Sequence, residues 1–221
     1  MLELIKKYRI FLGVFIVFSV VVLSLFYSAL KPQKTLPIYN PADVNPELVD
    51  STVQYKSKYH TIADFSFINQ NGKTITQKDY EGKIYVADFF FTTCPTICPK
   101  MTANLSEIQA AFANNPKVKL LSHTVFPETD SVPALKAYAI EHKVDDKQWN
   151  LVTGDKKEIY TMARKSYLAV KLGKPSELYD MVHTENFVLV DTKRRVRGFY
   201  DGTNKEDMKR LIEDITFLAA E

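Results

Sequence analysis

The hydrophobic pattern divides the chain into one long uncharged run followed by shorter, alternating segments. Residues 10–30 read IFLGVFIVFSVVVLSLFYSAL and carry no charged side chain. A helix rises about 1.5 Å per residue, so a run of this length spans roughly 30 Å, the thickness of the hydrocarbon core of a bilayer. The run therefore predicts a single transmembrane helix that anchors the protein in a membrane.

A cleaved signal peptide is the alternative interpretation of this run. The apolar part of a signal peptide is about 7–15 residues long and ends at small residues, whereas Ser28-Ala29-Leu30 is a poor cleavage site. We therefore expect an uncleaved anchor. Lys6, Lys7 and Arg9 precede the run, and the positive-inside rule then predicts that residues 1–9 are cytoplasmic.

Everything after the anchor is expected on the other side of the membrane. No transit peptide rich in Arg and Ser precedes the run, so we expect a single-pass protein of a bacterial inner membrane with its domain in the periplasm. Residues 31–60 carry prolines at positions 32, 37, 41 and 46, which predicts a stiff, extended linker. Residues 61–221 are then long enough for one domain with its own core.

Within residues 61–221 the pattern alternates between strands and helices. Asn71-Gly72 is a strong signal for a β-hairpin, and the nearly continuous apolar run 83–91 is typical of a central strand covered on both faces. The order of elements, a β-rich start followed by βαβ and ββα units, predicts an α/β thioredoxin-like fold with an N-terminal β-hairpin extension. The predicted strands are 62–68, 83–91, 118–125, 187–190 and 195–200, and the predicted helices are 97–112, 132–142, 156–167 and 205–219.

Composition and charge exclude some function classes. The 29 Lys and Arg residues nearly balance the 26 acidic residues, and no basic stripe with interleaved aromatic residues occurs, so we expect no nucleic-acid partner. Cys94 and Cys98 are the only cysteines, too few for a disulfide-stabilised secreted scaffold. A disulfide between them would close a very short loop and stabilise the fold little, which favours a chemical role for the pair.

The cysteine pair lies in the sequence CPTICP at residues 94–99, where a buried strand is followed by a helix. Amide groups at a helix N-terminus stabilise a thiolate and lower the pKa of a cysteine. If the helix included both residues, Cys94 and Cys98 would share one face, an arrangement that chelates one metal ion and still permits a disulfide. Soft thiolates favour Cu(I) and zinc, but a structural zinc site needs four protein ligands. The alternative is that both cysteines are only small buried hydrophobic residues.

A histidine is the expected third ligand. His183 directly precedes the strand 187–190, and in thioredoxin-like folds the segment entering this strand lies against the cysteine pair. An imidazole there would complete an open site suited to copper. His123 is the rival, since it ends a neighbouring strand, although the alternation of strand residues could equally point it away. His60 is expected in a loop and His142 in solvent.

Taken together, these residues resemble the SCO/SenC family of copper proteins. The matching stretches include VADFFFTTCPTICPKM at residues 86–101, His183-Thr184 and RGFYDG at residues 197–202. The resemblance implies a copper metallochaperone that binds copper through the two cysteines and the histidine, or an enzyme, a thiol–disulfide reductase, as some family members are. It also implies a role in assembly of the copper centre of cytochrome c oxidase, with the copper-bearing oxidase subunit and an upstream copper donor protein as partners.

Two residues bear on a redox alternative. Many family members carry aspartate directly before the histidine, whereas Val182 stands here. Asp88 lies six residues before Cys94, as a buried aspartate does in thioredoxins, and could accept a proton during disulfide exchange or simply bind nearby backbone. The alternative function is therefore a membrane-anchored thiol–disulfide oxidoreductase that uses Cys94, Cys98 and Asp88. Peroxidase action by a single cysteine is weaker, because Cys98 is available as a second thiol.

Overall fold

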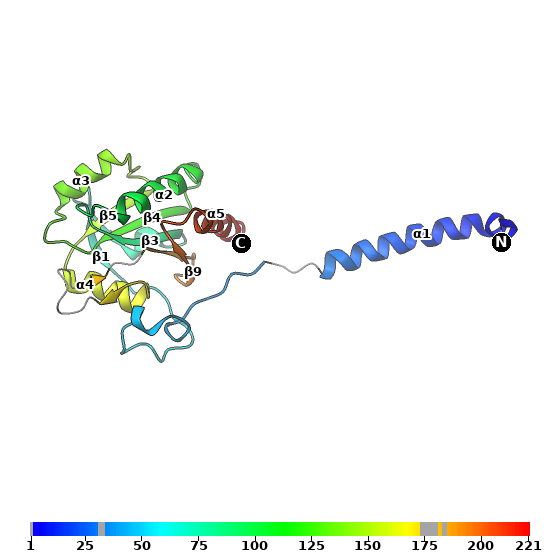
Figure 1. Ribbon diagram of the computed structural model, residues 1–221, viewed down its shortest axis with the longest axis horizontal. Helices are drawn as coiled ribbons and strands as arrows, with labels where there is room; N and C mark the ends of the chain where they lie inside the picture. The colour runs from blue at the N-terminus through cyan, green and yellow to red at the C-terminus, as the bar shows by residue number, and fades with distance from the viewer. Residues whose placement is uncertain (1, 31–33, 173–180, 183–184) are drawn as a thin grey trace. The chain divides into compact units, whose positions relative to one another are not determined.

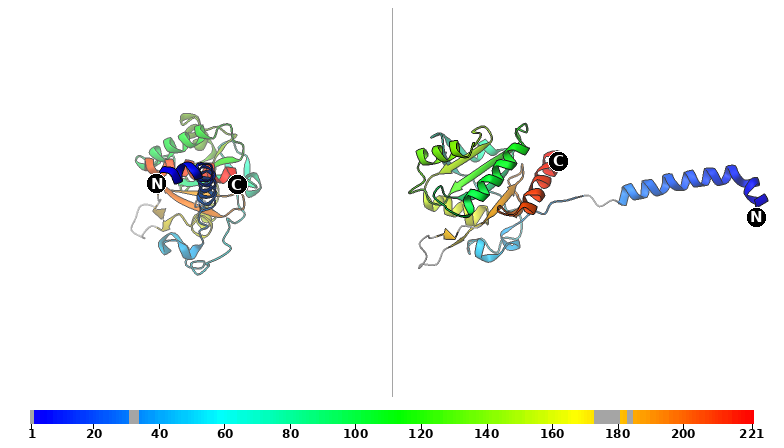
Figure 2. Two further views of the ribbon diagram at one scale, coloured as in Figure 1. Left: turned by 90° about the vertical axis from the view of Figure 1, so that its right-hand side faces the viewer. Right: turned by 45° about the horizontal axis from the view of Figure 1, so that its top comes forward.

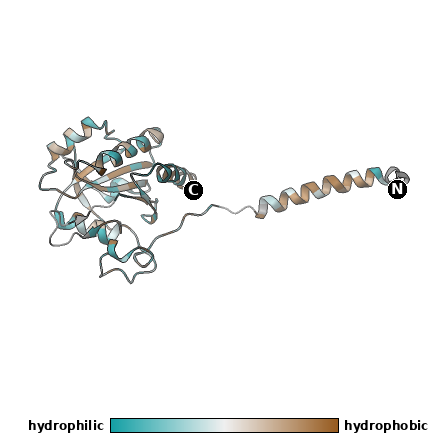
Figure 3. Ribbon diagram, viewed as in Figure 1, coloured by the Kyte–Doolittle hydropathy of each residue, from teal (hydrophilic) through white to brown (hydrophobic). Residues whose placement is uncertain are grey.

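The computed structural model describes residues 2–30, 34–172, 181–182 and 185–221, and the chain divides into two compact units, Met1–Thr35 and Leu36–Glu221. The first unit contains one helix, α1 (Leu2–Leu30). Its stretch Tyr8–Ser28 has a mean hydropathy of 2.7 and none of it is buried, and most of its ribbon is coloured as hydrophobic in Figure 3. By length and composition α1 could cross a membrane, although an N-terminal signal sequence would have the same properties.

The second unit is built on a seven-stranded sheet with the strand order β2-β1-β5-β4-β3-β8-β9. Strands β3, β4 and β5 are parallel, whereas β1, β8 and β9 run antiparallel to their neighbours. The bounds are β1 (Ser66–Asn69), β2 (Thr74–Thr76), β3 (Ile84–Phe90), β4 (Val118–Thr124), β5 (Trp149–Thr153), β8 (Asn186–Val190) and β9 (Val196–Asp201). A separate two-stranded ladder joins β6 (Lys171–Leu172) to β7 (Met181–Val182).

Helices cover both faces of the sheet (Figures 1 and 2). Three helices, α2 (Ile97–Ala111), α3 (Val132–Glu141) and α5 (Lys205–Ala220), lie over one face. The other face is covered by α4 (Lys156–Thr161) and a π-helix, η4 (Met162–Ser166), which follows it directly. The remaining short helices are 3₁₀ turns: η1 (Pro41–Asp43), η2 (Pro46–Leu48) and η3 (Gln77–Tyr80).

Most predicted elements are confirmed. Every residue of β3 is buried, as expected for a strand covered on both faces. The hairpin at Asn71-Gly72 joins β1 to β2, and Gly72 has a φ of 71°, a conformation that glycine adopts without steric cost. The prediction of residues 62–68 as a strand was too long at its start, since β1 begins at Ser66. Strand β5 was missed, because the polar residues Asn150 and Thr153 interrupt its apolar pattern.

Residues 36–60 are not the extended linker that the prolines predicted. The guanidinium group of Arg197 on β9 donates to the backbone carbonyls of Leu36 and Pro37, each at 3.0 Å, and binds the carboxylate of Asp191 at 2.9 Å. Only 5% of Arg197 is exposed, and a buried guanidinium needs such partners for its donors. The compact unit therefore begins at Leu36, and the predicted boundary at residue 61 was wrong.

Replacing Arg197 with methionine should lower the free energy of unfolding by roughly 3 kcal/mol, because it removes one partner of a buried ion pair. Asp191 would keep Arg195 as its ion-pair partner, and the carbonyls of Leu36 and Pro37 would lose the donors that Arg197 provides. Urea denaturation followed by the fluorescence of the buried Trp149 measures the change.

The matched control is Lys209→Ala. Lys209 and Glu206 form an exposed ion pair with a separation of 3.8 Å, so this variant should lose less than about 1 kcal/mol. Equal losses of unfolding free energy in the two variants would contradict the inference that Arg197 holds Leu36 and Pro37 against β9.

Candidate metal centre

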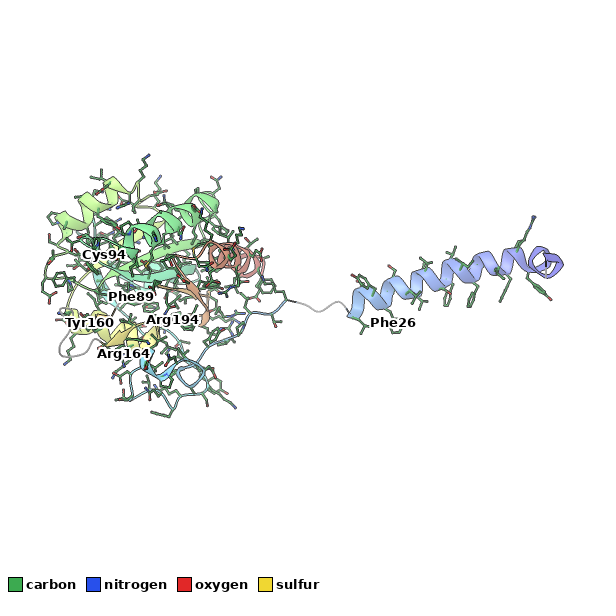
Figure 4. The ribbon with its side chains drawn as sticks, viewed as in Figure 1. Phe26, Phe89, Cys94, Tyr160, Arg164 and Arg194 are labelled. Atoms are coloured by element: carbon green, nitrogen blue, oxygen red, sulfur yellow. The ribbon has the colours of Figure 1, made fainter. Side chains whose placement is uncertain are left out.

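The cysteine pair lies where β3 ends and α2 begins. The Cys94 amide donates to the carbonyl of Phe91 at 3.3 Å, which closes a turn directly after the strand. Cys98 lies in the first turn of α2, and its amide donates to the Cys94 sulfur at 3.5 Å. Both thiols are free and buried, with exposed fractions of 6% and 1%, and Figure 4 labels Cys94 at this edge of the sheet.

The two cysteines do not share a helix face, because α2 begins at Ile97, as predicted, and Cys94 therefore lies outside the helix. Thr96 is the N-cap and has φ −122° and ψ −77°, which is not helical. Pro95 therefore lies in the turn before the helix, and Pro99 occupies the third helical position, where its missing N–H leaves no intrahelical bond unmade. The Cys94 sulfur consequently lies in front of the helix N-terminus and receives amide hydrogen bonds from it.

The two thiols differ in acidity. Burial acts to raise the pKa of Cys94, but the backbone amides of Thr96, Cys98 and Ile97 and the Cys98 thiol donate to its sulfur and hold the pKa below the ordinary value. Burial raises the pKa of Cys98 well above the ordinary value, and the neighbouring Cys94 sulfur and the charge of Asp88 add to this effect. Near neutral pH the site therefore combines a readily formed thiolate with a protonated thiol.

Asp88 lies on the same side of the sheet as the thiols. Its carboxylate accepts a hydrogen bond from the Ser122 hydroxyl, and Ser122 in turn accepts one from the indole nitrogen of Trp149 at 2.8 Å. Burial raises the pKa of Asp88 to about 7, although the Ser122 hydrogen bond opposes that shift. Asp88 is thus held by a side-chain network, and it can change its protonation state near neutral pH.

His123 lies on the opposite face of the sheet. Asp88 pairs with Ser122 and Phe89 with His123 in the parallel register of β3 and β4, and neighbouring residues of a strand point to opposite faces. The imidazole stacks on Phe89 with ring centroids 5.1 Å apart, and Tyr167 lies at 5.2 Å. Neither ring nitrogen has a hydrogen-bond partner among the described residues. The rival ligand therefore does not face the thiols.

Two other histidines are held by packing. His60 lies in a loop, as predicted, but it is buried, and its Nε2 lies 2.8 Å from the carbonyl oxygen of Ser166. His142, predicted in solvent, is half-buried and packs on Tyr138 with ring centroids 4.1 Å apart. Both are accounted for by packing.

His183 lies outside the described residues, and its place beside the thiols stays a prediction. Strand β7 ends at Val182, the preceding residue. The described part of the chain contains no group of three or more His, Cys, Asp and Glu side chains that could hold a metal ion. The two cysteines are thus the two members of the predicted three-residue ligand set that the structure describes.

Asp130 is a residue of the site that the sequence analysis missed. It is fully buried, and its carboxylate accepts from the Thr92 amide at 3.0 Å and from the hydroxyls of Thr92 and Thr124, each at 2.5 Å. These bonds fix the turn that carries Cys94. An aspartate just before a helix is usually interpreted as its N-cap, but Ser131 takes that position here.

Comparison with known proteins identifies the family. The sequence profile of the SCO1/SenC family matches residues 53–220. The chain belongs to the SCO1/SenC family. The SCO1 protein homolog of Bacillus subtilis is 33% identical over 158 residues, which cover 71% of this chain and 81% of that relative.

Solved structures of other family members share the fold. BsSco, described as a member of the Sco family of cytochrome c oxidase assembly proteins with a disulfide switch, is 32% identical, with a TM-score of 0.63 over 73% of this chain and 94% of that chain. ScoI of Bradyrhizobium japonicum, solved with copper bound, is 25% identical, with a TM-score of 0.57 over 72% and 99%. The predicted α/β thioredoxin-like fold of this SCO1/SenC protein is confirmed.

Cys94 should be alkylated by iodoacetamide at lower pH than Cys98, because only the thiolate reacts and only the Cys94 pKa is lowered. Peptide mass spectrometry of the reduced protein, labelled for short times between pH 5 and 9, follows each thiol separately. Faster labelling of Cys98 in the folded protein would contradict the assigned asymmetry. Labelling in urea, where both thiols should react alike, is the control.

Replacing His123 with phenylalanine should weaken the acid sensitivity of folding. Burial lowers the pKa of His123 to about 3, so between that value and about 6.5 the unfolded chain binds a proton that the folded chain does not. Stability should therefore fall as pH decreases below about 6.5, and by pH 5 this histidine should account for about 2 kcal/mol. Urea unfolding of both proteins at pH 7 and pH 5 gives the difference. Identical losses in wild type and variant would refute this.

Proposed function

We propose that this SCO1/SenC protein is a copper metallochaperone that binds copper through Cys94, Cys98 and His183. On this proposal it delivers the metal to the copper centre of cytochrome c oxidase during assembly of that enzyme. The observation that carries the proposal is the pair of buried, free thiols at the junction of β3 and α2. The copper bound to the Bradyrhizobium japonicum relative supports copper as the metal, and the assembly role ascribed to the family of BsSco supports cytochrome c oxidase as the target.

The chemistry of the donors is consistent with copper. Two sulfur ligands are soft and favour Cu(I) over harder cations, and the addition of an imidazole nitrogen allows Cu(II) to bind as well. Cys94 provides the sulfur that ionises readily, whereas Cys98 must release a proton before it can coordinate metal. Copper affinity should therefore depend on pH through Cys98 more than through Cys94.

We also propose that α1 is an uncleaved, single-pass anchor in a bacterial inner membrane, with the domain on the periplasmic side. The support is the apolar stretch Tyr8–Ser28 and the basic residues before it. An anchored carrier would work at the membrane, where it receives copper from a donor protein and transfers it to the copper-bearing subunit of the oxidase.

A second function, thiol–disulfide exchange, is favoured by the unequal acidities of the two thiols. In that reaction the Cys94 thiolate attacks a disulfide of the target and releases one target sulfur as a thiolate. Cys98 then loses its proton and attacks the mixed disulfide, which leaves Cys94 and Cys98 oxidised as a disulfide and the target reduced. Asp88, with a pKa raised to about 7 by burial, is the nearby group that could accept the Cys98 proton.

His183→Ala separates the two functions, because metal binding needs the imidazole and disulfide exchange does not. Loss of a group that merely orients a ligand costs about 10- to 100-fold in metal affinity, and loss of a ligand should cost at least as much for Cu(II). Cu(I) binding by the two remaining thiols should fall less. Wild-type Cu(II) affinity should also decrease as pH falls through about 6.5, where imidazole becomes protonated.

The measurement is Cu(II) titration by visible absorption, paired with a disulfide-reductase assay on the same preparations. Cys94→Ser is the control that should lose both activities. Unchanged Cu(II) affinity in His183→Ala would eliminate His183 as a ligand. Retained copper binding in Cys94→Ser would eliminate the proposed site altogether.

A further inference from the structure

Exposed hydrophobic side chains of the second unit gather near its start. Among the described residues after α1, the large hydrophobic side chains that are exposed are Ile38, Tyr55, Tyr59, Ile68 and Ile140. Three of these lie within residues 38–59, and the exposed fractions of Tyr55 and Tyr59 are 76% and 96%. Hydrophobic side chains that gather on one part of a surface, unlike those scattered singly, indicate a contact site.

Hydrogen bonds hold the tyrosine loop, residues 51–59, against the first residues of the unit. The Ala42 amide donates to the carbonyl of Lys56 at 3.0 Å. The His60 amide donates to the side-chain oxygen of Asn40 at 3.2 Å. Residues 38–42 and the tyrosine loop therefore lie side by side, and Figure 1 draws both in shades of light blue.

Tyr59 is held outward by the residue that follows it. His60 is buried, and its Nε2 lies 2.8 Å from the carbonyl oxygen of Ser166 on η4. Tyr59 itself has a φ of 60°, a left-handed conformation that a bulky residue adopts at a steric cost and glycine adopts without one. An exposed tyrosine thus stands where backbone sterics favour glycine, which is consistent with a role for its ring.

Two lysines beside the tyrosines give the loop a positive charge. Lys56 and Lys58 are exposed, and in the described part of the chain neither forms an ion pair. The nearest acidic residues along the chain are occupied. Asp50 accepts hydrogen bonds from the amide and the hydroxyl of Thr52 at 2.9 and 2.6 Å, and Asp64 forms an ion pair with an arginine at 2.6 Å. The two ammonium groups are therefore available to an external anion.

A short connection limits how far this surface can lie from the end of α1. Residues 31–35 separate α1 from Leu36, and a fully extended chain of this length spans roughly 20 Å. A domain the size of the second unit is about 40 Å across. Because the connection is shorter than the domain and Arg197 holds Leu36 on β9, the residues around Leu36 stay close to any membrane that contains α1.

We propose that the tyrosine loop docks on the surface of the lipid bilayer in which α1 is anchored. Tyr55 and Tyr59 lie among the lipid headgroups, where the apolar ring and the polar hydroxyl of tyrosine are both accommodated. Lys56 and Lys58 bind the phosphates of anionic headgroups. The inference rests on the proposed role of α1 as an uncleaved anchor and is independent of the copper ligands.

The test uses the full chain in vesicles of phosphatidylcholine that is brominated near the headgroup, with and without phosphatidylglycerol. Bromine quenches a tryptophan that enters the bilayer surface, so Tyr59→Trp and Tyr55→Trp should both be quenched. Ile140→Trp is the matched control, because Ile140 is 68% exposed but lies on α3. It should show only the signal of the buried Trp149 plus an unquenched tryptophan. Equal quenching at Ile140 and Tyr59 would overturn the proposal.

The lysines are tested in the Tyr59→Trp background. In vesicles that contain phosphatidylglycerol, Lys56→Gln and Lys58→Gln should each lower the ratio of docked to undocked domain by about fivefold, and high salt should weaken docking of the parent. Lys117→Gln is the charge-matched control, since Lys117 is exposed in the turn before β4, and it should leave quenching unchanged. Equal effects of all three substitutions would overturn the assignment of the loop lysines.

The outcomes separate this inference from the proposed anchor. Extraction of the chain from the vesicles by alkaline carbonate would refute the anchor and the docking with it. A chain that resists extraction while Tyr55→Trp and Tyr59→Trp stay unquenched would refute the docking alone. A blue-shifted emission of Tyr59→Trp that requires several chains per vesicle, without quenching by bromine, would assign the loop to contact between copies and overturn the lipid assignment.

Discussion

The complete burial of strand β3 is the constraint on which the rest of the structure depends. Each of its seven residues is shielded, with β4 on one side, β8 on the other, and helices over both faces. The strand must therefore satisfy its backbone within the sheet and place its side chains alternately on two dry faces. That alternation puts Asp88 on the side of the thiols and Phe89 on the side of His123. Cys94 lies in the turn that follows the last residue of the strand.

The two faces of the sheet consequently carry different chemistry. On one face, a carboxylate, a hydroxyl and an indole form a connected polar network beneath the cysteine pair. On the other, His123 is enclosed by aromatic rings and lacks hydrogen-bond partners among the described residues. A buried polar network can tune the acidity of a neighbouring thiol, whereas an unpartnered neutral imidazole chiefly makes folding sensitive to acid. Strands β3 and β4 thus place the groups near the thiols on one face of the sheet and the packed imidazole of His123 on the other.

Sequence patterns predicted those elements that are determined by residues close together in the chain. Strand β3 follows from its continuous apolar run, the hairpin from Asn71-Gly72, and the reactive turn from the cysteines that follow a buried strand. The failures have a different origin. Arg197 and Asp130 are single residues whose partners no local sequence pattern reveals. Each binds a segment that is distant in the sequence: Arg197 binds the carbonyls of Leu36 and Pro37, and Asp130 binds the turn at Thr92. The start of α2 at Ile97 was predicted, but the spacing of the cysteines does not encode the non-helical backbone angles of Thr96, which leave Cys94 outside the helix.

The unequal thiols have a consequence for the electrostatics of metal transfer. The pKa of the Cys94 sulfur is lowered, that of Cys98 is raised, and both sulfurs are buried. On the proposed ligand set, a Cu(I) ion bound by both sulfurs would displace the Cys98 proton, so one positive charge would replace another and the net charge of the buried site would be conserved. Because an uncompensated charge in such surroundings is costly, loading and unloading would be an exchange of cations. A carrier with this ligand set would move metal without having to stabilise a second buried charge.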